Sequence, residues 1–167
     1  MYDICYSRCM TVTDFRVLAF FAADHAQAVG GKVYVNGGFW NRLRFPTYPS
    51  IVPSLALVAV LEVPYRAYHQ DHGFRLGMED ADGNVLELEA TGTFRIGAEP
   101  DLRVGDPTLM PIAIPITGLK IDRPGDYAFT LSVDGTELER YQVRAIQVAA
   151  TMKLELANPE APDNEEA

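Results

Sequence analysis

Strict alternation of apolar and polar side chains constrains this chain more than any other sequence feature. Between residues 86 and 96 the apolar positions are Leu86, Leu88, Ala90, Phe94 and Ile96, and the polar ones are Glu87, Glu89, Thr91, Thr93 and Arg95. Tyr127–Val133 repeats the pattern. A period of two is typical of a β-strand with one buried and one solvated face. The neighbouring pairs Asp82-Gly83 and Asp134-Gly135 predict hairpin turns.

The rest of the chain offers further segments of strand length separated by turn residues. Gly30-Gly31 predicts a tight hairpin turn, and Gly37-Gly38 predicts a bulge or bend. Pro111 and Pro115 predict that their strand lies at a sheet edge or is irregular. The additional predicted strands are Arg16–Ala28, Lys32–Leu43, Ser54–Val63, Gly73–Glu79, Met110–Ile116 and Leu138–Val148.

These segments predict an all-β fold. Arg44–Pro53 holds three prolines and is expected to be an extended connection, and Pro64 is expected to open a short helical insertion. With no amphipathic helix long enough to cover a sheet, the second layer has to be another sheet. The predicted architecture is an immunoglobulin- or fibronectin-like antiparallel β-sandwich of about seven to nine strands.

The length of 167 residues fits one domain. We expect a flexible leader at 1–13, the β-sandwich at 14–150 and a disordered acidic tail at 151–167. Cys5 and Cys9 lie in the leader, where two thiols are too few for a usual structural metal site. Met10 is an alternative start, which would leave both cysteines outside the working protein.

Charge argues against nucleic-acid and membrane partners. The net charge is −9, and five of the 23 acidic residues lie in 155–167, which leaves 18 acidic against 14 basic residues elsewhere. A phosphate backbone or an anionic lipid surface needs a basic patch. No apolar run is long enough to span a bilayer, and the N-terminus lacks the apolar core of a secretory signal. We therefore expect a cytoplasmic protein, or a virion protein if a phage encodes it.

The segment Pro124-Gly125-Asp126-Tyr127 resembles the late-strand pattern of immunoglobulin-like sandwiches, in which a Tyr after a turn hydrogen-bonds back across a corner. Over residues 15–148 the order of features is similar to that of an uncharacterised bacterial and phage family of small immunoglobulin-like proteins. The resemblance rests on residues 22–27, residues 30–40, Glu62-Val63-Pro64 and the Pro-Gly-x-Tyr hairpin. The resemblance implies an immunoglobulin-like fold and carries over no catalytic residues. The missing inter-strand cysteine pair separates the chain from antibody domains.

His69, Asp71 and His72 form the sharpest metal candidate. Histidines three residues apart on a helical turn would lie on one face, with Asp71 as a third ligand or a partner of one. A solvated helical cap explains the same residues without a metal.

Other polar groups have plain structural explanations. Asp24-His25 has no nucleophile on a strained turn near it in the sequence, and a polar pair ending a strand accounts for it. The acidic run at 79–84 resembles a calcium loop but lacks its spacing, and a hairpin turn explains it. Glu87 and Glu89 could form a glycosidase pair by spacing, although two solvent-facing glutamates on one strand are far commoner.

Aromatic and arginine side chains alternate between residues 39 and 48. Trp, Tyr and Arg are common anchors of protein interfaces. The residues predicted to form such an interface are Trp40, Arg42, Arg44 and Tyr48, with Phe39 and Phe45 beside them. The alternative is that the aromatic residues enter the core and leave the arginines solvated.

We therefore expect a non-enzymatic protein-binding or structural module without a cofactor, whose partner is another protein or a second copy. Within this class, a phage virion accessory or decoration protein is one alternative. A metal-dependent enzyme or sensor using His69, Asp71 and His72 is another. The sequence also allows a third alternative, a sandwich that binds a ligand in a pocket between its two sheets.

Overall fold

The computed structural model describes residues 15–97 and 103–149. The predicted leader and tail, with Cys5, Cys9 and Met10, lie outside this part of the chain. The elements are β1 (Arg16–Val29), β2 (Lys32–Gly38), β3 (Arg42–Phe45), β4 (Ser50–Val63), the 3₁₀ turn η1 (Tyr65–Ala67), β5 (Asp71–Asp80), β6 (Val85–Arg95), β7 (Thr108–Ile121), β8 (Gly125–Val133) and β9 (Thr136–Gln147).

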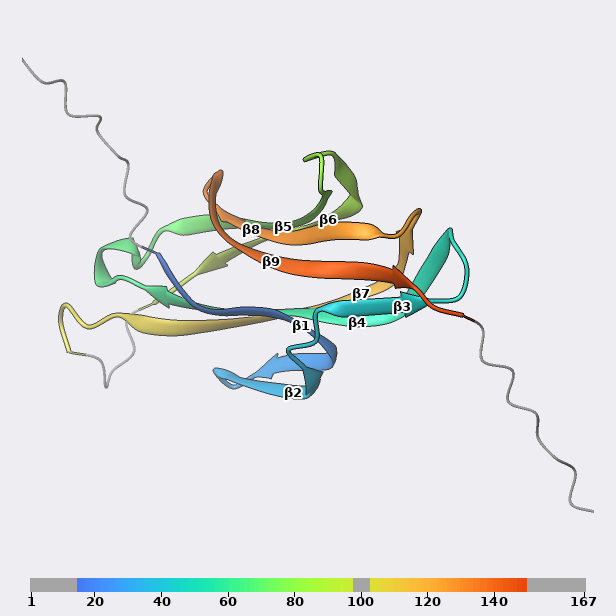
Figure 1. The fold of residues 1–167 in the computed structure, drawn as a ribbon. Coiled ribbons are helices and arrows are strands. Elements are labelled where there is room, and N and C mark those ends of the chain that lie inside the picture. Colours follow the sequence, from blue (N-terminus) through green and yellow to red (C-terminus); the bar gives the residue numbers. More distant parts are fainter. Residues whose placement is uncertain (1–14, 98–102, 150–167) are drawn as a thin grey trace, which may run out of the picture.

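The strands form two sheets that face each other (Figure 1). Sheet A has the order β2-β1-β4-β7, and sheet B has the order β3-β9-β8-β5-β6. Neighbouring strands are antiparallel except β3 and β9, which run parallel. The prediction of an all-β protein with two packed sheets is confirmed. Its immunoglobulin-like identity stays a prediction.

One hydrophobic core lies between the sheets because alternate residues of each strand point inward. β8 contributes Tyr127, Phe129, Leu131 and Val133, all buried as the alternation predicted. β4 contributes Leu55, Leu57 and Leu61, which are at most 2% exposed. The predicted inner face of 86–96 is likewise the less exposed face of β6.

The end of β1 and β2 form a hairpin on the side of sheet A that faces away from sheet B (Figure 1). β1 pairs with β4 through residues 16–23 and with β2 through residues 23–29. A second apolar cluster lies here, formed by Phe21, Ala23, Ala26, Ala56 and Val58, with Val33 of β2 packed against it. β1 and β4 are therefore apolar on both faces, as their sequences indicated.

The predicted strand Lys32–Leu43 is wrong as one element. Its first part is β2 of sheet A, and its second part is β3 of sheet B. The change of sheet begins at Gly37 and Phe39, whose φ angles are +63° and +64°. The left-handed region ends the extended conformation, so the chain turns and crosses to the other sheet. The connection predicted at 44–53 is also shorter, because β4 already begins at Ser50.

The predicted hairpin turns are present. Gly30 and Gly31 have φ angles of +57° and +72°, which the turn between β1 and β2 requires. The turn between β8 and β9 is made by Asp134 and Gly135, at +49° and +78°. Where the chain passes from sheet A to sheet B, the Tyr127 hydroxyl donates a 2.8 Å hydrogen bond to the Arg123 carbonyl. This is the bond back across a corner that the Pro-Gly-Asp-Tyr segment predicted.

Candidate protein-binding surface

The four residues predicted to form an interface divide between two environments. Trp40 and Tyr48 pack against the core between the sheets. The Tyr141 hydroxyl donates a 2.9 Å hydrogen bond to the Trp40 carbonyl, and Phe45 and Tyr48 meet edge to face at 5.7 Å. Arg42 and Arg44 are exposed on β3. The predicted mixed aromatic–arginine surface is therefore not one continuous surface, although binding at either set stays a prediction.

The two core aromatic residues carry polar atoms without a partner. Trp40 Nε1 and the Tyr48 hydroxyl are buried and make no hydrogen bond in the described part of the chain. Burial raises the pKa of Tyr48, and the neighbouring Tyr127 raises it further. Arg42 instead lines a shallow hollow of about 230 Å³ with Asp126 and Arg144. Asp126 already binds Arg144 through a 2.6 Å ion pair.

The structure does not gather the predicted metal ligands. The helical turn ends at Ala67, His69 has a φ of +61°, and His72 belongs to β5. The expected helical face carrying both histidines was therefore wrong. Asp71 and His72 are consecutive in β5 and point to opposite faces, and Asp71 approaches Arg95 at 3.7 Å. Within residues 15–97 and 103–149, no cluster of three or more His, Cys, Asp or Glu residues could hold a metal ion.

His72 is a buried link between separate segments. Its Nδ1 lies 2.7 Å from Asp134 Oδ2, and its Nε2 lies 2.9 Å from the Ala67 carbonyl. Both partners are acceptors, so both contacts are hydrogen bonds only when the imidazole is protonated and both ring nitrogens donate. Burial alone lowers the pKa of His72, but the hydrogen bonds to Asp134 and Ala67 and the charge of Asp134 outweigh it and raise the pKa. In that protonated form the ring has no lone pair with which to accept a proton from a substrate.

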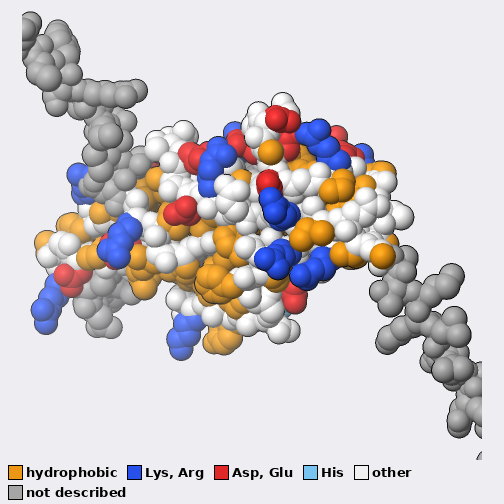
Figure 2. Space-filling view, viewed as in Figure 1, with side chains coloured by type: hydrophobic (Ala, Val, Ile, Leu, Met, Phe, Trp, Pro, Cys, Tyr) orange, Lys and Arg blue, Asp and Glu red, His pale blue; other side chains and the backbone are white. Residues whose placement is uncertain are grey.

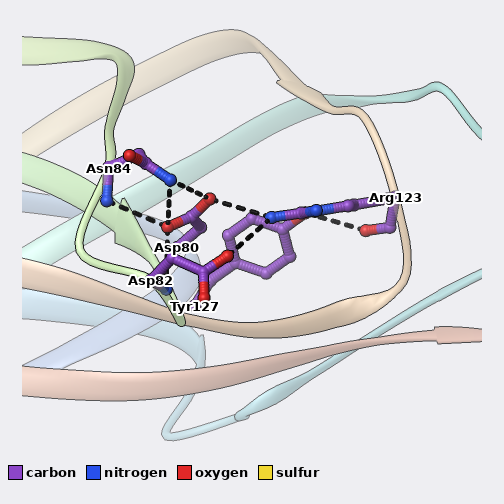
Figure 3. A network of polar contacts seen from close by, with 5 residues as sticks. All are labelled: Asp80, Asp82, Asn84, Arg123 and Tyr127. Carbon is purple, nitrogen blue, oxygen red and sulfur yellow. Dashed lines mark hydrogen bonds and ion pairs between the residues drawn. The ribbon is translucent and has the colours of Figure 1, made fainter.

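The acidic turn that resembled a calcium loop is occupied by the chain's own donors (Figure 3). Asp80 Oδ1 accepts hydrogen bonds from the backbone amides of Asp82 and Asn84 at 2.9 Å. Arg123 reaches Asp80 at 3.1 Å and Asp82 at 3.3 Å from the turn between β7 and β8. The hydrogen bonds from Asn84 lower the pKa of Asp80. The network joins two turns of the fold.

The remaining polar candidates are exposed. Asp24 and His25 lie within β1, which continues to Val29 and so does not end at this pair as expected. Glu87 and Glu89 lie on the solvent face of β6, and Glu89 forms a 3.1 Å ion pair with Arg75.

Phe39 has the most unusual environment among the large apolar side chains. It is 70% exposed, and its φ of +64° costs a non-glycine residue about 1–2 kcal/mol. Its amide donates a 3.0 Å hydrogen bond to the Ala22 carbonyl, and its ring stacks on Phe21 at 3.9 Å and 17°. These contacts hold an exposed aromatic ring flat against sheet A. In the sequence, Gly37-Gly38 predicted a bulge or bend just before Phe39, but the strand was expected to continue to Leu43.

Phe39 lies beside an apolar region on the outer face of sheet A. The register aligns Ala19 with Val60 and Val60 with Pro111 across three strands. The next row holds Leu109 opposite Glu62, and Leu18 is the extra residue at an irregularity in β1. Leu18 and Leu109 are 41% and 55% exposed. The members of this apolar patch are Leu18, Ala19, Phe39, Val60, Leu109 and Pro111.

The apolar patch contains no charged side chain. Glu62 adjoins Leu109 and pairs with Arg16 at 3.6 Å, and the Asp24 carboxylate lies close to Gly37, two residues before Phe39. Figure 2 shows hydrophobic side chains gathered over β1 and β7, with charged side chains of both signs scattered around them and over sheet B. Contiguous apolar surface rimmed by polar groups is typical of an interaction site.

Fold and surface together define a two-sheet all-β protein with an apolar patch on one outer face. Residues 18–146 match the model of a family of unknown function, DUF6941. The chain belongs to that family. A comparison with curated proteins found no match. In the part of the chain that the structure describes, no helix has the length and apolar character needed to cross a membrane.

Proposed function

We propose that the chain is a non-enzymatic protein-binding module built on an immunoglobulin-like β-sandwich, and that its working surface is the apolar patch around Phe39. The observation that carries the proposal is the 70% exposure of Phe39 in a left-handed backbone conformation. Strained residues persist where the surrounding structure imposes them, and they concentrate at functional sites.

The chemistry of the apolar patch favours a polypeptide partner. An uncharged surface gives no attraction to phosphate or to an anionic headgroup, whereas an apolar side of another protein loses water on contact with it. Phe39 has the features of an anchor, since it is aromatic, projects from the surface and is held by Phe21 and Ala22. The Arg16–Glu62 pair supplies a polar rim.

Two further observations support the proposal. The Tyr127 hydrogen bond across the corner between the sheets favours the immunoglobulin-like part. Both ring nitrogens of His72 are engaged within the fold, one by Asp134 at 2.7 Å and the other by the Ala67 carbonyl at 2.9 Å, which leaves neither for a substrate. This geometry suits a structural role.

The test compares the wild-type full chain with Phe39→Ser and Arg44→Ser. Each protein is immobilised on a support and incubated with extract of the native host. A partner retained by wild type is then purified and titrated directly against all three proteins. We expect Phe39→Ser to weaken its binding by about 30-fold, as for an interface anchor. Equal binding of wild type and Phe39→Ser would overturn the proposal, and loss with Arg44→Ser alone would overturn it and place the site on β3. Circular dichroism of each variant controls for folding.

A further inference from the structure

A small hollow opens on the outer face of sheet B, over Gly77 of β5. Its volume is about 80 Å³. Because Gly77 has no side chain, the surface is depressed at this point. The polar residues Glu79, Thr130, Ser132 and Glu137 line the hollow from three neighbouring strands, β5, β8 and β9.

Thr130 is the unusual residue of the hollow. It points away from the core, since its neighbours Phe129 and Leu131 point inward, yet it is only 8% exposed. Within residues 15–97 and 103–149 its hydroxyl has no hydrogen-bond partner. Buried hydroxyls are normally hydrogen-bonded. The Thr130 hydroxyl is therefore a group that a molecule in the hollow would satisfy.

A second oxygen borders the floor of the hollow. Thr130 Oγ1 lies 3.1 Å from the position that a Cβ on Gly77 would take, and the Leu88 carbonyl oxygen lies 3.8 Å from the same position. A carbonyl has two lone pairs, so it can accept a hydrogen bond in addition to one within the sheet. Ser132 adds another hydroxyl to the lining. The floor thus offers acceptors to a hydrogen-bond donor.

A β-bulge in β6 accompanies this arrangement. Gly77 pairs with Glu89 and Glu79 pairs with Val85, so residues 86–88 of β6 lie opposite Met78 alone. Extra residues bend a strand and change the direction of its groups, and such bulges are common beside active sites. Leu88, whose carbonyl borders the hollow, belongs to this bulge.

The charge around the hollow favours a cation. Arg140 joins the two lining glutamates, at 2.8 Å from Glu79 and 3.0 Å from Glu137. Arg75 also lines the hollow, and it pairs with Glu89 at 3.1 Å. Three carboxylates against two guanidiniums leave one negative charge in excess, which attracts a single positive charge and repels a phosphate or carboxylate.

Size and donor chemistry narrow the class of cation. Drug-sized ligands occupy pockets of about 300–1,000 Å³. This hollow therefore admits only the end of a chain. A metal ion is not favoured, because the described residues contain no cluster of three or more His, Cys, Asp or Glu residues that could hold one. An ammonium group has three N–H donors for the oxygens of the floor.

We propose that the hollow over Gly77 binds a primary ammonium group. Thr130, Ser132 and the Leu88 carbonyl accept its hydrogen bonds, and the excess negative charge attracts it. The ammonium belongs either to a free alkylamine or to a lysine side chain of a polypeptide. The site is independent of the proposed binding function, whose surface lies on sheet A.

NMR titration of the ¹⁵N-labelled full chain with ethylammonium chloride tests the proposal. Tetramethylammonium chloride is the control, because it has the same charge and no N–H donor. Each salt replaces an equal concentration of sodium chloride. We expect saturable shifts of the backbone amides of Gly77, Leu88 and Thr130 with ethylammonium alone. Equal shifts with both salts, or no saturable shift with ethylammonium, would overturn the proposal.

Three variants locate the site. Thr130→Val keeps the branched shape and removes the hydroxyl, and it should raise the dissociation constant of ethylammonium by about tenfold or more. Gly77→Ala fills the floor with a methyl group 3.1 Å from Thr130 Oγ1 and should abolish saturable binding. Gly73→Ala is the matched control, because its Cβ points to the same side of β5 and meets no described atom within 4 Å. The amide spectra report the folding of each variant. Wild-type affinity in Thr130→Val or in Gly77→Ala would overturn the proposal.

A capped lysine distinguishes the two sources of the ammonium group. Nα-acetyl-lysine methylamide is titrated beside its norleucine analogue, which lacks the ammonium group. Tighter binding of the lysine compound than of ethylammonium supports a lysine side chain, and equal binding supports a free alkylamine. Binding of the norleucine compound as tight as that of the lysine compound would overturn ammonium recognition.

Discussion

Replacing His72 with phenylalanine would test the charged state of the buried link between β5, η1 and the β8–β9 turn. Phenylalanine keeps a planar ring beside Phe15 and Phe94, which contact His72 at 4.9 and 5.4 Å between ring centroids. It removes both donors and leaves the Ala67 carbonyl without its side-chain partner. Asp134 can be solvated, because its side chain is 40% exposed. We expect a loss of about 2–3 kcal/mol in the free energy of unfolding at pH 6.

The sign of the pH dependence follows from the direction of the shift. The pKa of His72 is raised above 6.5 in the folded protein, so folding stabilises its protonated form. This stabilisation is complete below pH 6.5 and is lost as pH rises through the folded-state pKa. The slope reaches at most about 1.4 kcal/mol per pH unit. The pKa of Asp134 is lowered, because its hydrogen bonds to His72 and Gly73 outweigh the opposing effect of burial. The stabilisation that the Asp134 carboxylate contributes is present above pH 3.8 and is lost as pH falls through the folded-state pKa of Asp134.

Urea denaturation between pH 5 and pH 9 measures this prediction for wild type, His72→Phe and the exposed control His25→Phe. The difference between wild type and His72→Phe should be largest near pH 6 and should shrink as pH rises, while His25→Phe follows wild type. Nitrogen NMR should show both ring nitrogens of His72 protonated at pH 6. A stability difference that is constant with pH, or one ring nitrogen without a proton, would refute the charged state.

Three further substitutions test the fold, each by urea denaturation. Phe129→Ala deletes a ring that is 0% exposed and should cost about 3–5 kcal/mol, so a loss below 1 kcal/mol would contradict the core as described. Gly37→Ala places a Cβ at a φ of +63° and against the Asp24 carboxylate, which should cost about 1–2 kcal/mol. Tyr127→Phe removes the 2.8 Å bond to Arg123 and should cost about 1 kcal/mol, and no change would show that the corner bond contributes nothing.

Local patterns in the sequence were sufficient for much of the fold. The alternation at 86–96 and at Tyr127–Val133 predicted the faces of β6 and β8, because a half-buried strand leaves a period of two. Glycine pairs predicted turns, and the prolines of β7 predicted an edge. Apolar runs on both faces indicated inner strands, and β1 and β4 are the inner strands of sheet A.

Features that depend on distant residues could not be predicted. The break at Phe39 follows from contacts with Phe21 and Ala22, whereas the local alternation continues through it. His72 contacts Asp134, which lies 62 positions further along the chain. β3 pairs in parallel with β9, which lies about a hundred residues further along. The division of the predicted interface residues between two environments also depends on distant contacts. Trp40 and Tyr48 fit an interface by residue type, but their burial is determined by β3 joining sheet B.

Site-specific photo-crosslinking is the most direct test of the proposed binding surface. A photoreactive phenylalanine analogue at position 39 would be compared with the same analogue at Gln142, an exposed residue of β9 on sheet B. We predict a discrete protein adduct from position 39 in the native host and none from position 142. Adducts of equal yield from both positions, or an adduct from position 142 alone, would contradict the assignment of the binding surface to sheet A.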